Sequence, residues 1–154
     1  MDITGYLGEG LIFTDLSAPG KEEAFGAMVD HIVAQGAVSP EIREKLLEKL
    51  REREGLANTF VGNGAAIPHA FLGLLDRGMI AVGRFKDGVE YGGTATEPVR
   101  LMFMIIGPEQ DPRAHMRLLA CLVRVIKNKP LMESILGSRS PEEIGRLLAR
   151  AAGG

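Results

Sequence analysis

The order of apolar patterns along the chain predicts an α/β fold, a single-domain layered sandwich in which a mixed β-sheet is flanked by helices. Two segments with helical periodicity come first, a group of short β-forming runs follows, and further helical segments close the chain. Of its 154 residues, 45% are hydrophobic and 25% charged, as in an average globular protein. With no internal repeat or low-complexity linker, residues 1–154 are expected to form one domain that folds by itself.

The N-terminal part of the chain predicts one strand and two helices. The short apolar run 10–13 is typical of a strand or an extended entry segment, and it ends in a turn-rich segment. In 21–35 the apolar residues recur every three or four positions, which predicts a helix. Ser39 and Pro40 combine an N-cap with a proline at the first helical position, so a second helix is expected over 39–53. Its charged side is expected to be a solvated face with helix-spaced ion pairs rather than a binding patch.

The middle of the chain predicts four strands. The runs 59–61 and 65–67 contain small and β-forming residues and are joined by an Asn-Gly turn. Two longer runs, 79–85 and 99–106, are also expected to be strands, and the second is apolar enough for the middle of a covered sheet. Lys-Asp-Gly at 86–88 is typical of a hairpin turn between them. These patterns leave the strand order open.

The C-terminal part of the chain predicts three helices. Asp111 and Pro112 repeat the combination of cap and proline, and the segment 118–126 that follows is apolar almost all round, so this helix should pack on the sheet. Pro130 begins a short helical stretch. The run Ser-Pro-Glu-Glu that opens 140–150 forms a capping box and predicts the last helix.

Composition and charge narrow the classes of function. A formal net charge of -2 gives no basic footprint for nucleic acid, so proteins or small anions are the expected partners. The single cysteine, Cys121, excludes an intramolecular disulfide and any multi-cysteine metal site, which is typical of a reducing compartment. The sequence has neither an export signal nor an apolar run of about 18 residues. We therefore expect a cytoplasmic protein without direct membrane insertion.

The three histidines differ in their local settings. His31 occupies an ordinary mid-helix position. His69 follows a strand, two glycines and Pro68, an arrangement that is expected to project the side chain from a fixed loop at a sheet edge. His115 lies in the first turn of a predicted helix, where outward-pointing backbone N–H groups favour anions. His69 and His115 are therefore the candidates for chemistry.

Three other kinds of site are disfavoured by the sequence: a zinc site, a nucleotide-binding loop and a serine or cysteine nucleophile. A zinc site is unsupported because His69 and His115 lie far apart in the sequence, with no nearby cysteine and no H-x-x-x-H pair. The run 62–67 lacks the third glycine of a dinucleotide-binding loop, and no glycine run precedes Lys-Ser or Lys-Thr. No G-x-S-x-G elbow exists, and Cys121 lies in the most apolar helix, where a buried inert thiol is expected.

The run Arg-Glu-Gly-Leu-Ala-Asn-Thr-Phe-Val-Gly-Asn-Gly-Ala-Ala-Ile-Pro-His-Ala at residues 53–70 closely resembles the enzyme IIA signature of the fructose/mannitol class. This class belongs to the phosphoenolpyruvate-dependent sugar phosphotransferase system of bacteria and includes the nitrogen-regulatory enzyme IIA proteins. The resemblance continues through 98–103 and 140–144, so it covers nearly the whole chain as a single enzyme IIA type-2 domain. Ala65 and Ala70 depart from the family's usual residues without touching the chemistry.

The resemblance implies a role for three residues. His69 stands in the family's Ile-Pro-His element and matches its phosphoryl-accepting nucleophile. Arg53 matches the family's active-site arginine, which stabilises charge, and His115 matches a second histidine, which holds the phosphoryl group. No cofactor or metal is implied, because a neutral imidazole with a pKa of about 6.5 is a competent nucleophile near pH 7.

The resemblance also implies the partners. An HPr-type phosphocarrier protein would donate the phosphoryl group, and an enzyme IIB would receive it. The alternative is a regulatory protein whose phosphorylation state controls its binding to target proteins. The apolar residues of 71–75 are expected either to form a docking patch for these partners or to pack in the core.

Overall fold

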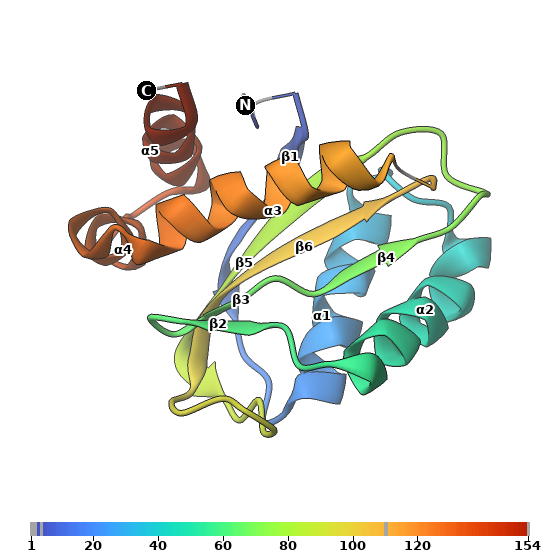
Figure 1. Ribbon diagram of the computed structural model, residues 1–154, viewed down its shortest axis with the longest axis horizontal. Coiled ribbons are helices and arrows are strands. Elements are labelled where there is room, and N and C mark those ends of the chain that lie inside the picture. The colour runs from blue at the N-terminus through green and yellow to red at the C-terminus, as the bar shows by residue number, and fades with distance from the viewer. Residues whose placement is uncertain (1–2, 4, 110, 154) are drawn as a thin grey trace.

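The sheet at the centre of the protein is mixed and six-stranded, and helices cover both of its faces (Figure 1). The computed structural model describes residue 3, residues 5–109 and residues 111–153. The predicted α/β layered sandwich is therefore confirmed. The strands of the described part are β1 (Leu7–Leu16), β2 (Phe60–Gly62), β3 (Ala65–Ala66), β4 (His69–Phe71), β5 (Met79–Val89) and β6 (Val99–Gly107).

Strand β6 is the centre of the sheet, as its apolar sequence predicts. The order is β1-β5-β6-β3-β2, and β4 also pairs with β6. β5 lies antiparallel to β6, whereas β3 and β4 both run parallel to it along its other edge. β2 and β3 form the predicted hairpin, in which Asn63 and Gly64 take φ values of 49° and 67°. Positive φ at both central positions is the geometry that Asn-Gly turns favour.

The turn predicted at 86–88 is wrong, because β5 continues through these residues to Val89. The register of β5 against β6 shifts between Arg84 and Val89, and Gly88 has a φ of 79°. A β-bulge inserts extra residues without reversing the strand, and a glycine with positive φ is one of its usual components. The chain reverses only after β5, in the segment 90–98.

The helices agree with the predicted segments apart from their ends. The segment 39–53 begins as a 3-10 turn, in which Ser39 contacts Glu41 instead of capping a backbone amide, and the helix runs on to Leu56. Ser140 accepts from the amide of Glu143 at 3.2 Å, as the capping box predicts. The helices are α1 (Lys21–Ala34), the 3-10 helix η1 (Pro40–Ile42), α2 (Arg43–Leu56), α3 (Pro112–Lys127), α4 (Lys129–Leu136) and α5 (Pro141–Gly153).

Two apolar clusters fill the two faces of the sheet. Side chains alternate along a strand, so Met102 and Met104 of β6 join one cluster and Leu101 and Phe103 the other. α1 and α2 cover the first cluster, and α3, α4 and α5 cover the second. A site at the edge of the sheet can therefore receive side chains from both helical layers.

Helix α3 is more amphipathic than its sequence suggests. Asp111 caps it by accepting from the amide of Arg113 at 3.0 Å, which confirms the predicted start. Leu118 and Leu122 are buried against the sheet, but Ala120 is exposed, so the expectation of a helix apolar almost all round is wrong. None of the helices in the described residues is both long and apolar enough to cross a membrane.

Candidate active site

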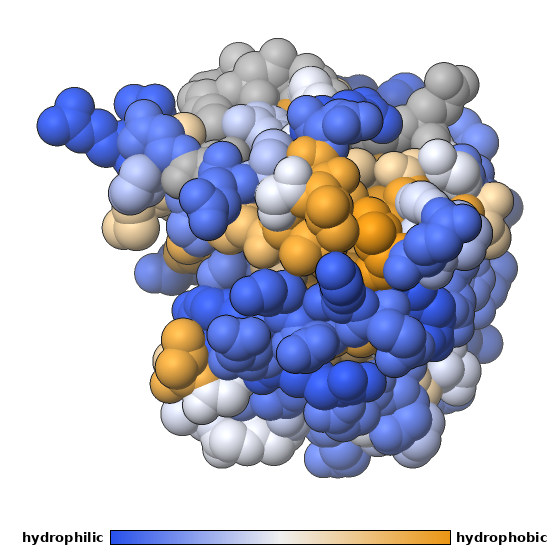
Figure 2. Space-filling model, turned by 90° about the vertical axis from the view of Figure 1, so that its right-hand side faces the viewer, coloured by the Kyte–Doolittle hydropathy of each residue, from blue (hydrophilic) through white to orange (hydrophobic). Residues whose placement is uncertain are grey.

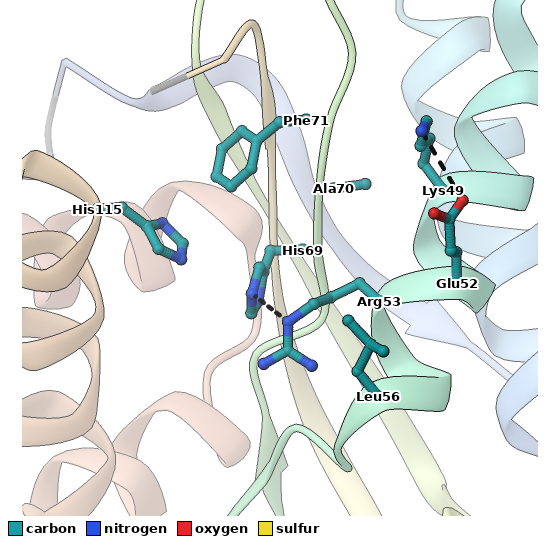
Figure 3. Close-up of a pocket in the computed structure, with 8 residues that line it drawn as sticks. All are labelled: Lys49, Glu52, Arg53, Leu56, His69, Ala70, Phe71 and His115. Carbon is teal, nitrogen blue, oxygen red and sulfur yellow. Dashed lines mark hydrogen bonds and ion pairs between the residues drawn. The ribbon is translucent and has the colours of Figure 1, made fainter. Parts of the chain in front are cut away.

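His69, Arg53 and His115 come together at one end of β4 (Figure 3). Each residue comes from a different element: His69 opens β4, Arg53 lies in the last turn of α2, and His115 lies in the first turn of α3. They line a pocket of about 370 Å³. The other residues that line it are Lys49, Glu52, Leu56, Ala70 and Phe71.

His69 belongs to a strand, not to the loop that its sequence suggested. β4 pairs in parallel with the end of β6, and His69 lies opposite Ile105. Pro68 separates β4 from β3 because it has no amide proton, but its carbonyl still accepts from the amide of Ile105 at 3.0 Å. The two neighbouring strands therefore fix the backbone of His69, and its side chain is only 7% exposed.

Both ring nitrogens of His69 have partners that define the tautomer. Nδ1 lies 3.0 Å from the carbonyl oxygen of Ile67, which can only accept a hydrogen bond. Nε2 accepts from Nε of Arg53 at 3.0 Å, and a guanidinium can only donate. The proton is therefore on Nδ1 and the lone pair on Nε2, so Nε2 is the nucleophilic atom of the ring.

Arg53 is held at two points and keeps one group available. Besides its contact with His69, Nη1 donates to the carbonyl of Ala57 at 2.9 Å. Within the described residues, Nη2 has no hydrogen-bond partner. In Figure 3 the guanidinium lies beside the His69 ring, whereas Lys49 and Glu52 pair with each other at 3.7 Å. A guanidinium in this position can donate to an anion bound at Nε2.

Glu54, the residue after Arg53, is a buried carboxylate with four partners. It accepts from the amide and the hydroxyl of Thr59 at 2.8 and 2.6 Å and from the Tyr91 hydroxyl at 3.2 Å. Lys21 pairs with it at 3.4 Å and lies 4.4 Å from the centre of the Tyr91 ring. Sequence reasoning gave Glu54 no role of its own. The available signal was its position four residues after Leu50, on the apolar stripe of α2.

A chain of contacts connects Glu54 to the imidazole. The amide of Thr59 donates to Glu54, and the carbonyl of Thr59 accepts from the amide of Ile67 at 3.0 Å. The carbonyl of Ile67 then accepts from Nδ1 of His69. Glu54 therefore positions the site twice, through the neighbouring Arg53 on α2 and through this chain to His69.

His115 approaches His69 from the other helical layer. The two ring centroids are 4.9 Å apart, and the Phe71 ring lies 5.0 Å from that of His115 (Figure 3). Nδ1 of His115 is buried and has no hydrogen-bond partner in the described part of the chain. Among the described residues, contacts with the rings of His69 and Phe71 therefore position this ring, and no hydrogen bond at Nδ1 selects its tautomer.

Both histidines are neutral near pH 7. Burial is the main cause that lowers the pKa of His69 below its ordinary value of 6.5; the positive charge of Arg53 lowers it too, while the Ile67 carbonyl and Glu54 raise it. Burial, His69 and Arg53, in that order, lower the pKa of His115. Burial and the charge of Glu54 raise the pKa of Tyr91, so its phenol stays protonated as a donor. The site thus combines neutral imidazoles with the fixed guanidinium of Arg53.

The residues left outside the site behave as their local patterns suggest. His31 is exposed on α1, and its Nδ1 lies 2.8 Å from the carbonyl oxygen of Ala27. Cys121 is buried on α3. No group of three or more His, Cys, Asp and Glu side chains that could hold a metal ion occurs in the described residues.

The surface around the pocket carries apolar side chains beside charged ones. Figure 2 shows an orange apolar patch bordered by blue hydrophilic residues on the face to which α2 belongs. Leu56, Leu74 and Met116 are exposed by 81%, 59% and 65%. In the segment 71–75, Leu75 is buried and packs in the core, whereas Leu74 is exposed, and a docking role for the exposed residues stays a prediction.

Nearly the whole chain matches one protein family. A model of the family described as phosphoenolpyruvate-dependent sugar phosphotransferase system, EIIA 2, matches residues 6–151. The PTS system fructose-specific EIIA component of Haloferax volcanii is 32% identical over 129 residues, which cover 84% of this chain and 82% of that protein.

Solved structures give the same result for the fold. The nitrogen regulatory protein IIA-Ntr from Neisseria meningitidis superposes with a TM-score of 0.84 and 26% identity, covering 95% of this chain and 98% of its own. Enzyme IIAMTL in its complex with phosphorylated enzyme IIBMTL from Escherichia coli has a TM-score of 0.75 at 24% identity, covering 94% and 97% of the two chains. At that identity the second likeness is one of fold.

Proposed function

Because the chain belongs to the EIIA 2 family of the phosphoenolpyruvate-dependent sugar phosphotransferase system, we propose that it carries a phosphoryl group on Nε2 of His69. The observation that carries this proposal is the tautomer of His69. Its proton is held on Nδ1 by the Ile67 carbonyl, so the lone pair of Nε2 faces the pocket and Arg53. A neutral imidazole oriented in this way is an activated nucleophile that needs no separate base.

In the proposed step, Nε2 of His69 attacks the phosphorus of a phosphohistidine on the donor protein. The new N–P bond forms as the donor's N–P bond breaks, and the electron pair of the broken bond returns to the donor imidazole. His69 keeps its Nδ1 proton, which continues to donate to the carbonyl of Ile67. No proton has to leave, so the step balances without a cofactor.

Arg53 and His115 would stabilise the transferred group. The three phosphoryl oxygens carry negative charge throughout an in-line transfer, so positioned donors are the main catalytic requirement. The Nε–H of Arg53 occupies the lone pair of Nε2 at rest; it would leave this lone pair as the donor approaches and turn to a phosphoryl oxygen, so that Nε2 is free to attack. The ring of His115, 4.9 Å from that of His69, would donate to another oxygen.

Two protein partners would use this site in turn. The donor is an HPr-type phosphocarrier, and the recipient is an enzyme IIB, the kind of protein with which the fold relative from Escherichia coli was solved. The exposed side chains of Leu56, Leu74 and Met116 near the pocket would contact both partners. Apolar centres with polar rims are typical of such interfaces.

A regulatory role is the second candidate function. The likeness to the nitrogen regulatory protein IIA-Ntr extends over 95% of this chain with a TM-score of 0.84. In that role the phosphoryl group on His69 would change the charge of the pocket and thereby alter the binding of regulatory target proteins. The chemistry of phosphorylation is the same in both roles, and only the recipient differs.

The proposal is tested by transfer of labelled phosphate from phosphoenolpyruvate through enzyme I and HPr to the purified protein. Wild type, His69→Ala, His115→Ala and the exposed-histidine control His31→Ala are compared. Acid-labile label is expected on wild type and on the His31 and His115 variants, and none on the His69 variant. Wild type that takes no label from its cognate HPr would refute the carrier function.

The two roles are separated by adding a recipient to the labelled protein. An enzyme IIB that removes the label supports the sugar-transport role. Retention of the label, together with a target protein that binds only one of the two phosphorylation states, supports the regulatory role.

A further inference from the structure

A second cavity lies at the opposite end of the sheet from His69. It has a volume of about 360 Å³. Arg84, at its wall, pairs with Leu101 near the beginning of β6, whereas His69 pairs with Ile105 near its end. At about 3.3 Å per residue, these two points on β6 are roughly 13 Å apart. The cavity is lined by Thr14, Asp15, Arg84, Phe85, Lys86, Arg100 and Leu136.

Positive charge predominates in this cavity. Arg84, Lys86 and Arg100 line it together with a single carboxylate, that of Asp15. The ion pairs of the described residues involve other cations, namely Lys21, Arg43, Lys49 and Arg51. Three cations without a paired carboxylate around one cavity are a suitable site for an anion.

Arg84 is rigidly positioned for such a ligand. Its Nη1 donates to the carbonyls of Ile135, Leu136 and Ser138 at 3.2, 3.3 and 2.6 Å, and its Nε donates to Thr14 at 3.2 Å. All four partners are neutral, and Nη2 has no partner among the described residues. The guanidinium is thus half-buried, fixed in place, and left with a donor group and a charge that no carboxylate balances.

Irregular backbone surrounds the same cavity. The register of β5 shifts after Arg84, and the register of β1 shifts between Phe13 and Leu16, which flank Thr14 and Asp15. Bulges of this kind redirect side chains and are common beside binding sites. Two of them meet here, although a regular pair of strands would leave no such hollow.

We propose that this cavity binds the phosphate group of a small metabolite. A dianion matches the surplus of cations, because the guanidinium of Arg84 can donate to one oxygen while Lys86 and Arg100 contact the others. A volume of about 360 Å³ is in the range of pockets for small ligands. The inference does not depend on the phosphorylation of His69.

The test is a titration of the ¹⁵N-labelled protein with inorganic phosphate and with glycerol 3-phosphate, followed by amide NMR at constant ionic strength. Saturable shifts are expected at Thr14, Arg84, Lys86 and Arg100. Shifts confined to His69 and Ala70 would mean that phosphate binds at the active site alone, which would overturn this inference and leave the proposed function intact. Saturation by inorganic phosphate alone would identify free phosphate as the ligand, and tighter binding of the ester would identify a phosphorylated metabolite.

Substitutions at the exposed cations complete the test, because Arg84 itself holds α4 in place. Lys86→Gln and Arg100→Gln are each expected to weaken phosphate binding at the cavity by about tenfold, the loss of one charge-assisted hydrogen bond. Arg146→Gln removes an equal charge from the exposed surface of α5 and should change the affinity less than about twofold. Equal losses in all three variants would indicate general charge attraction and refute a built site.

Discussion

On the α2 side of His69 hydrogen bonds fix the polar groups, whereas on the α3 side ring contacts position His115. Arg53 bonds to His69 and to the carbonyl of Ala57, and the adjacent Glu54 has four partners of its own. His115 has a buried Nδ1 without any partner among the described residues and touches the site through its ring.

The difference assigns different tasks to the two helical layers. Arg53 of the α2 layer, together with the Ile67 carbonyl, defines the tautomer and orientation of the His69 ring. The α3 layer supplies the His115 ring, whose Nδ1 has no partner among the described residues and which, in the proposed function, could adjust to the phosphoryl group. An unsatisfied buried nitrogen costs about 1–3 kcal/mol, and such groups tend to persist where a ligand completes them.

Among these substitutions, removing the guanidinium of Arg53 should have the largest effect on the rate of phosphoryl transfer. Arg53→Gln is expected to slow phosphoryl transfer by about 10²- to 10³-fold, the usual cost of one preorganised donor. The rate is measured by rapid-quench transfer from phosphorylated HPr. Arg51→Gln, an exposed cation on the same helix that pairs with Glu22, is the matched control and should keep the wild-type rate. Equal effects in the two variants would show that only the general charge of α2 matters.

Truncating His115 tests the side of the site that lacks hydrogen bonds. His115→Ala is expected to slow transfer by about tenfold, a smaller loss than that of Arg53, because one adjustable donor is removed. The free energy of unfolding should change by less than about 0.5 kcal/mol, since the substitution removes an unsatisfied nitrogen and alanine favours the helix. Rapid-quench kinetics and urea unfolding provide the two values. A large loss of stability would mean that the packing contacts of the ring outweigh the cost of its unsatisfied nitrogen, contrary to this prediction.

Substituting Glu54 tests how much this carboxylate contributes to the hydrogen-bonded α2 side of the site. In Glu54→Gln the amide oxygen can still accept from Thr59, and its NH₂ can donate to the two hydroxyls, but the charge pairing with Lys21 is lost. Because Lys21 is partly exposed, we expect a loss of about 1–2 kcal/mol in stability and a severalfold slower transfer. Glu48→Gln, an exposed carboxylate on the same helix, is the control for urea unfolding and kinetics. Unchanged transfer in Glu54→Gln would limit Glu54 to a purely structural role.

The smallest expected effect is on the pH dependence of stability. The pKa of both His69 and His115 is lowered below 6.5 in the folded protein. Below pH 6.5 the unfolded chain therefore binds protons that the folded chain does not, and the free energy of unfolding falls as pH falls, until the folded pKa values are passed. The free energy of unfolding, measured with urea at several pH values between 7 and 5, should depend less steeply on pH in His69→Ala and in His115→Ala than in wild type. The same pH dependence of the free energy of unfolding in all three proteins would contradict the conclusion that burial keeps both imidazoles neutral.

The sequence predicted the regular elements where periodicity was strong. The helical spacing in α1 and α3 and the apolar run of β6 led to elements within a few residues of those observed. The Asn-Gly turn between β2 and β3 followed from local backbone preferences. Such signals depend on a residue and its near neighbours, which is why they are readable without the fold.

Two of the errors lie where the partner strand decides the structure. β4 has three residues, too few for an alternating pattern, and it is a strand only because β6 offers it free backbone groups. The run 86–88 has the composition of a turn, yet pairing on either side keeps it in β5 as a bulge. Local propensity was overridden by pairing in both cases.

By itself, the sequence predicted three site residues: His69 after its rigid proline, His115 in a helical first turn, and Arg53 in the recognisable run 53–70. Only the tertiary structure decided that these residues from three elements meet in one pocket, that Ile67 and Arg53 fix the tautomer of His69, and that Glu54 supports them. The reason is physical. A motif records residue types along the chain, whereas tautomer, burial and pKa depend on atoms that are distant in sequence and adjacent only after folding.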